Sequence, residues 1–170
     1  LLWGYPLPEH DDGAVGRVSN LVGVCATRGR VLVLGLTGAR TGSNETGSRV
    51  ACMEESSGRL LWSRDLPGRT DSLFPIGSTL VGVTAAGGEV TLLDARSGAR
   101  VGEPIPAMVL SRGGVAAAAL GRFLYVVTTS GTLKALDPVR AAELWAVKLD
   151  AFGEGALCDL AVGEGIVAMV

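Results

Sequence analysis

The sequence predicts an all-β fold built from four-stranded antiparallel units, because one turn motif recurs in it about every 40 residues. In its clearest copy an acidic residue, Glu54, is followed by Gly58 and then by Trp62. Further copies begin at Asp94 and Asp137, which lie 40 and then 43 residues further along the chain. A hydrophobic content of 48% and 25 glycines are typical of a compact, turn-rich protein. Units of this size cannot bury both faces alone, and they stack radially as the blades of a β-propeller.

The later copies differ from the first at single positions. The copy at Asp94 keeps Gly98 but has Gly102 where the tryptophan would stand, and the copy at Asp137 keeps Trp145 but has Ala141 where the glycine would stand. Residues 1–8, LLWGYPLP, match residues 60–67, LLWSRDLP, at five positions. This match gives Trp3 the same structural position as Trp62 and Trp145. We therefore predict that each tryptophan lies on an outer strand and packs against the neighbouring blade.

The turn itself has a physical explanation. A short acidic side chain can accept hydrogen bonds from backbone amides two residues further on. Gly58 and Gly98 supply the left-handed conformation that a hairpin with a bulge requires. Ala141 lacks this freedom, so we predict a wider or differently shaped third turn.

The remaining strands follow from apolar and β-branched runs that are separated by glycines. We expect strands at 21–26, 30–36, 49–53, 60–66, 72–75, 79–84, 89–93, 99–103, 115–119, 123–128, 132–136, 143–149, 157–162 and 166–170. They divide the chain into about three complete blades and two partial ones: the last strand of a preceding blade at 1–8, blades at 15–67, 70–106 and 107–150, and the start of a further blade at 151–170. The Gly-, Ser- and Thr-rich stretch 37–48 is predicted to be a loop.

The composition limits the kinds of partner that we expect for this protein. A net charge of −2 gives no electrostatic footprint for nucleic acid, and no apolar run reaches the roughly 18 to 20 residues of a membrane span. The first residues show neither an initiator Met nor a signal peptide, so we expect a longer natural chain. Cys25, Cys52 and Cys158 lie in apolar segments without metal-ligand spacing and are predicted to be buried hydrophobes. A disulfide between two of them remains open.

Residue types with metal-binding chemistry occur at His10 and its acidic neighbours 9, 11 and 12, and at Asp71 and Asp159. None has metal-ligand spacing. A solvated loop is expected for the cluster around His10, whereas Asp71 and Asp159 could face the axis or a rim of the propeller. Asn44 begins a sequon in a predicted loop. No G-x-S-x-G pattern is present. We predict no catalytic, cofactor-binding or metal-binding residue. Four loop residues are candidates for partner contacts, namely Tyr5, Arg40, Arg69 and Arg112.

The spacing of the repeat resembles the tryptophan-docking motif of quinoprotein-like β-propellers, Ala-x-Asp-x-x-x-Gly-x-x-x-Trp. The resemblance covers essentially the whole chain, with the strongest matches at 52–62 and 135–145. WD-repeat propellers share the period, but they place Trp directly before the acid, where Met53, Leu93 and Leu136 stand here. Such families have six to eight blades, which implies that the rest of a longer chain or a second copy closes the ring.

The resemblance implies three alternative functions. The first is a non-catalytic scaffold for protein partners that dock on blade loops, similar to the propeller lipoprotein of the outer-membrane barrel assembly machinery. The second is part of a quinone-dependent dehydrogenase. In that family the cofactor lies between a Trp and a disulfide of adjacent cysteines, and this sequence has no such Cys pair. The third is a sensor propeller fused to a kinase or an acyl-adenylating enzyme. The absence of the Cys pair favours the scaffold, and the family favours an extracytoplasmic location.

Overall fold

The computed structural model describes residues 18–37, 47–110, 115–149, 160–163 and 165–169. All regular elements in these ranges are β-strands, which confirms the predicted fold class. The strands are β1 (Val18–Thr27), β2 (Arg30–Thr37), β3 (Gly47–Glu54), β4 (Leu60–Leu66), β5 (Thr70–Ile76), β6 (Leu80–Ala85), β7 (Glu89–Asp94), β8 (Ile105–Pro106), β9 (Ala117–Leu120), β10 (Phe123–Val127), β11 (Thr132–Asp137), β12 (Ala142–Lys148), β13 (Leu160–Gly163) and β14 (Ile166–Met169).

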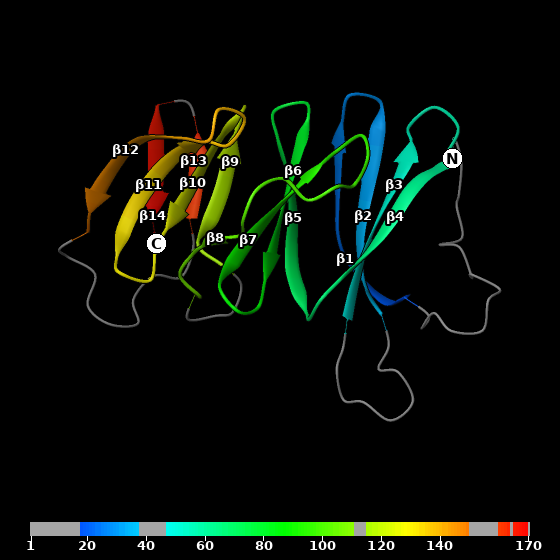
Figure 1. Ribbon diagram of the computed structural model, residues 1–170, viewed down its shortest axis with the longest axis horizontal. Coiled ribbons are helices and arrows are strands. Elements are labelled where there is room, and N and C mark those ends of the chain that lie inside the picture. The colour runs from blue at the N-terminus through cyan, green and yellow to red at the C-terminus, as the bar shows by residue number, and fades with distance from the viewer. Residues whose placement is uncertain (1–17, 38–46, 111–114, 150–159, 164, 170) are drawn as a thin grey trace.

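The strands form three four-stranded sheets and one two-stranded sheet, and within each sheet neighbouring strands are consecutive in sequence and antiparallel. The sheets stand side by side in chain order, from β1–β4 through β5–β8 to β9–β12, with β13–β14 behind the third (Figure 1). The first strands of successive sheets, β1, β5, β9 and β13, contact one another. This places the first strand of each sheet on the inside and the fourth on the outside, which is the arrangement of propeller blades.

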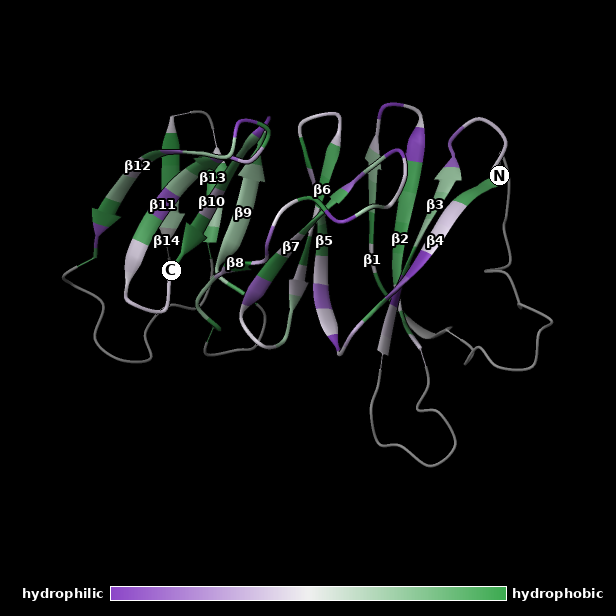
Figure 2. Cartoon of the chain, in the orientation of Figure 1, coloured by the Kyte–Doolittle hydropathy of each residue, from purple (hydrophilic) through white to green (hydrophobic). Residues whose placement is uncertain are grey.

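Each hydrophobic core lies between two consecutive sheets. Leu32, Leu34 and Val50 of the first sheet pack against Val81 and Leu93 of the second. A second core joins the second and third sheets, and a third joins the third sheet to β13. Apolar residues accordingly run along the middle of the inner strands, while hydrophilic residues gather at several of the turns (Figure 2). A sheet that buries both faces in this way depends on its neighbours for stability.

The turns of each sheet form two opposite rims. The β1–β2 and β3–β4 turns lie at one end, where the amide of Glu55 donates to the carbonyl of Gly29 at 2.9 Å. At the same rim the amide of Gly77, between β5 and β6, donates to the carbonyl of Gly121, between β9 and β10. The first bond joins two turns of one sheet, and the second ties two neighbouring sheets together at this rim, in addition to the apolar cores.

One prediction about local structure is wrong. A strand was expected at 99–103, but that segment contributes only a single bridge at Arg100, and β8 follows at Ile105–Pro106. The reason is Gly102, whose φ of 69° bends the backbone out of the extended conformation. The third turn is differently shaped, as expected. The amide of Arg140 donates to the carbonyl of Asp137, three residues earlier, whereas the first two turns are closed by the amides of Gly58 and Gly98, four residues after the acidic residue. Ala141 itself adopts the left-handed conformation, with φ 50°.

Candidate functional site

Trp62 of β4 packs on the turn of the next sheet, as the repeat motif predicted. Its indole Nε1 donates to the carbonyl of Ala95 at 3.3 Å, and its ring lies directly over Gly98. A Cβ atom on Gly98 would lie 2.6 Å from Cε3 of Trp62, which is closer than real Cβ contacts. The tryptophan and the glycine therefore form a single docking contact between the first two sheets.

The first two acidic residues of the motif organise their own turns. Asp94 Oδ1 accepts hydrogen bonds from the amides of Arg96 at 3.1 Å and Ser97 at 2.8 Å, and from the Ser97 hydroxyl at 2.7 Å. The Ser97 hydroxyl bond is the main reason that the pKa of Asp94 lies below its ordinary value. Glu54 has a longer side chain and accepts from the Ser57 hydroxyl at 2.5 Å, which likewise lowers its pKa. Gly58 and Gly98 both have φ near 70°, as predicted.

The third acidic residue differs from the others because it is buried. Asp137 is 1% exposed, and its Oδ2 lies 3.3 Å from Arg122 and 3.8 Å from Arg140. These are ion-pair distances without hydrogen-bond geometry at Oδ2, whereas Oδ1 accepts from the amide of Arg140 at 3.3 Å. Arg122 also lies over the ring of Phe123, 5.1 Å from its centroid. The contacts of Asp137 hold the third turn together, so the structure gives this carboxylate a structural position.

Trp145 occupies the corresponding outer strand, β12, but it is 40% exposed. It contacts Tyr125 of its own sheet at a ring-centroid distance of 6.0 Å. Its neighbours Leu144 and Val147 are also about half exposed. Among the described residues, no turn covers this tryptophan in the way that the Gly98 turn covers Trp62.

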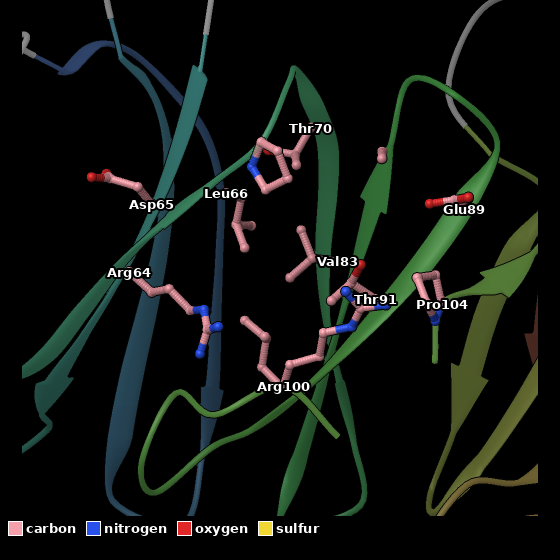
Figure 3. Close-up of a pocket in the computed structure, with 12 residues that line it drawn as sticks. Arg64, Asp65, Leu66, Thr70, Val83, Glu89, Thr91, Arg100 and Pro104 are labelled. Carbon is pink, nitrogen blue, oxygen red and sulfur yellow. The ribbon is translucent and has the colours of Figure 1, made fainter. Parts of the chain in front are cut away.

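A groove lies between the first and second sheets in the described part of the chain. Its volume is about 190 Å³, and Figure 3 shows its lining. The floor is made of the buried side chains of Leu66, Val83 and Leu93, and two prolines, Pro67 and Pro104, lie among the other lining residues. A volume of this size is below the roughly 300–1,000 Å³ of small-molecule pockets and suits one or two side chains.

Charged side chains give the groove its chemistry. Arg64 of β4 and Arg100 of the second sheet both line it, and they come from opposite walls. Arg64 Nη1 donates to the carbonyl of Gly98 at 2.8 Å, and Arg100 lies 3.4 Å from the exposed carboxylate of Glu103. Asp65 also lines the groove, but its carboxylate pairs with Arg49 at 2.6 Å and points away in Figure 3.

Three further polar side chains line the groove, namely Thr70, Glu89 and Thr91. Thr70 is 3% exposed, and its hydroxyl oxygen has no hydrogen-bond partner among the described atoms. Glu89 stands on the side of Pro104, away from Arg64 (Figure 3). This groove could not be predicted from the sequence, because Arg64 and Arg100 are 36 residues apart and belong to no recognisable motif.

The thiols of Cys25 and Cys52 are free. Both stand opposite Leu32 of β2, on β1 and β3 respectively, so they are two strands apart. Two strand spacings amount to about 9.5 Å, which exceeds the roughly 7 Å limit between the Cα atoms of a disulfide. Burial raises the pKa of Cys25 to about 11, with a further contribution from Cys52, whose own pKa is also raised by burial. A disulfide between these two cysteines is excluded by this geometry.

The other candidate residues give little chemistry. Arg69 is 65% exposed and pairs with Asp71 at 3.2 Å. No group of three or more His, Cys, Asp or Glu side chains that could hold a metal ion occurs among the described residues. The same residues contain no helix that is long and apolar enough to cross a membrane. The predicted strand at 1–8 and several single residues lie outside the described ranges: Trp3, Tyr5, His10, Arg40, Asn44, Arg112, Cys158 and Asp159.

Comparison with known proteins gives one family and several similar folds. A PQQ-repeat family model, described as the outer membrane protein assembly factor BamB, matches residues 1–101 and 86–170. The crystal structure of BamB from Moraxella catarrhalis is 19% identical at a TM-score of 0.52, covering 91% of this chain and 56% of that one. The designed protein Ika4 is 16% identical at a TM-score of 0.60, with 91% and 86% covered. HIRA(644–1017) is 16% identical at a TM-score of 0.55, with 82% and 44% covered.

At these identities the structural likeness concerns the fold alone. The chain spans about half the length of the BamB and HIRA chains that it matches, 56% and 44% respectively. No curated protein matches the sequence significantly.

Proposed function

Because the chain belongs to the PQQ-repeat family described as the outer membrane protein assembly factor BamB, we propose that it is a non-catalytic β-propeller scaffold that binds protein partners. A family that is described as an assembly factor supports a role in holding other proteins. The same description supports an extracytoplasmic location. Fold alone does not define function, so the proposal depends on surfaces of this chain.

The observation that carries the proposal is the open groove between the first two sheets, which presents two arginines above an apolar floor. Arginine is enriched where protein surfaces meet, because its guanidinium group offers five donors in a planar fork. The groove is also too small for a typical small-molecule ligand, as its volume of about 190 Å³ indicates. Nothing among the described contacts favours the dehydrogenase or the enzyme-fused sensor that the sequence left as alternatives.

Site-specific photo-crosslinking in the native host tests the proposal. A photoreactive phenylalanine analogue replaces one exposed residue at a time. The three positions are Val139 in the β11–β12 turn, Ser130 in the β10–β11 turn at the opposite rim, and Arg69 near the groove. A scaffold should give discrete adducts of higher mass at one or two of these positions, and mass spectrometry identifies the partner. Samples without irradiation are the control. The absence of any adduct at all three positions contradicts the scaffold function.

A further inference from the structure

We propose that the groove between β4 and the β5–β8 sheet binds an acidic peptide segment of a protein partner, with carboxylate groups held by Arg64 and Arg100 and a hydrogen bond made by Thr70. The inference rests on the proposed scaffold function and names the chemistry of its partner. The occupant follows from the charge of the groove, from its size and from an unsatisfied polar group within it.

The two arginines have donors available for a ligand. Arg64 uses Nη1 for the carbonyl of Gly98, which leaves its other guanidinium hydrogens available. The contact between Arg100 and Glu103 is long at 3.4 Å, and the Glu103 side chain is 97% exposed, so water weakens this pair. Guanidinium groups bind carboxylates through charge-assisted, often bidentate hydrogen bonds. The two guanidinium groups on opposite walls can therefore each take a carboxylate oxygen of a segment lying between them.

Thr70 gives an independent reason to expect a ligand. Its hydroxyl is buried in the groove lining and has no partner, whereas its amide donates a hydrogen bond to the hydroxyl oxygen of Ser48 at 2.9 Å. Buried polar groups without partners are rare in native proteins and call for an explanation. A peptide group or carboxylate in the groove would supply the missing hydrogen bond.

The shape of the groove favours an extended peptide over a larger ligand. The floor of Leu66, Val83 and Leu93 can contact an apolar side chain that lies between two polar ones. Successive side chains of an extended peptide point to opposite sides, so one apolar residue flanked by acidic groups fits a narrow cleft. Glu89 lines the same groove near Pro104, and its negative charge should repel an acidic side chain placed at that end. Removal of the Glu89 charge is therefore a useful control for the proposal.

The test starts from a library of random octapeptides displayed on phage, because it assumes no partner sequence. The purified protein should enrich peptides that contain Asp or Glu next to an apolar residue. The best enriched peptide is then synthesised with a fluorescent label, alongside a counterpart in which Asn or Gln replaces each acidic residue. Fluorescence anisotropy measures both dissociation constants.

The variants separate the groove from general electrostatics. Arg64→Gln and Arg100→Gln should each weaken binding of the acidic peptide about tenfold. Arg59→Gln removes the same charge outside the groove, at an exposed position that pairs with Glu54, and should change the dissociation constant less than about twofold. Glu89→Gln should tighten binding, because it removes a repulsive charge.

Thr70→Val distinguishes a ligand contact from a structural role. The valine side chain has nearly the same shape, and removal of an unsatisfied hydroxyl should leave the unfolding midpoint unchanged or slightly higher. The proposal requires that Thr70→Val nevertheless weakens peptide binding several-fold. Equal enrichment of neutral peptides, no enrichment at all, or equal affinity of Arg64→Gln and Arg59→Gln for the acidic peptide would overturn it. Photo-crosslinks that persist in a protein carrying both Arg64→Gln and Arg100→Gln would reject the groove while leaving the scaffold function intact.

Discussion

Gly98→Ala should destabilise the protein strongly, because the Gly98 position is constrained in two ways at once. Its φ of 70° costs an alanine about 1–2 kcal/mol of backbone strain. A Cβ atom there would also lie 2.6, 2.8 and 2.9 Å from three ring atoms of Trp62. Moving the indole to relieve this overlap should cost about 1–3 kcal/mol, as overpacked cores do. We expect a total loss of about 2–5 kcal/mol in the free energy of unfolding.

Urea denaturation followed by tryptophan fluorescence measures this loss, and Gly102→Ala is the matched control. Gly102 has nearly the same φ, 69°, but nothing lies within 4 Å of the position of its Cβ. The control should therefore show the backbone strain alone, about 1–2 kcal/mol. In a Trp62→Leu background the cost of Gly98→Ala should fall towards that of the control, because the overlapping ring is gone. If Gly98→Ala and Gly102→Ala destabilise the wild-type protein equally, the docking explanation is wrong.

Two further predictions concern titrating groups. In a Cys158→Ser variant, the thiols of Cys25 and Cys52 should react with Ellman's reagent at pH 8 at least tenfold more slowly than free cysteine, since burial raises the pKa of both and that of Cys25 to about 11; fast labelling before addition of guanidinium chloride would contradict this. The lowered pKa of Asp94 stabilises the folded state above the carboxyl's ordinary value of 3.8, and this stabilisation is lost as pH falls through the lower folded pKa. Urea midpoints measured from pH 5 down to pH 2.5 should therefore fall less steeply in Asp94→Asn than in the wild type, by a small margin since Asp94 lies in a partly exposed turn where solvent screens its charge; parallel curves would refute the contribution of this carboxylate.

Most strands could be predicted from the sequence, because they are short apolar segments bounded by glycines. The sequence of β6, LVGVTA, is almost entirely apolar. The strand is buried on both faces because it is an inner strand of the β5–β8 sheet, which lies between the β1–β4 and β9–β12 sheets. The segment 99–103 misled the prediction, since one bend at Gly102 displaces the outer strand to Ile105–Pro106. The turn of Ala141 does differ from the other two in its closing hydrogen bond, and the surrounding hairpin imposes a left-handed conformation that alanine adopts only under constraint.

The binding surface could not be predicted in the same way. The repeat motif identifies residues that build the blades, and those are the positions at which each copy must resemble the others. The groove depends on Arg64, Arg100 and Thr70, which come from β4, the β7–β8 connection and β5, and none of them belongs to the motif. Their proximity is a consequence of how two sheets pack side by side. Sequence spacing carries no information about that contact, whereas the structure shows it directly.

The exceptions to the motif follow from the contact between Trp62 and Gly98. The indole needs a backbone without a Cβ beneath it, so the tryptophan of one blade and the glycine of the next turn are a single feature. The second blade has Gly102 in place of the tryptophan, and the third turn then carries Ala141, which is exposed and which no indole covers in the part of the chain that the structure describes. An alanine is tolerated in this turn because the clash that excludes it at Gly98 is absent. By the same geometry, a surface that covers the half-exposed Trp145 must present bare backbone to the ring, as the turn of Gly98 does for Trp62.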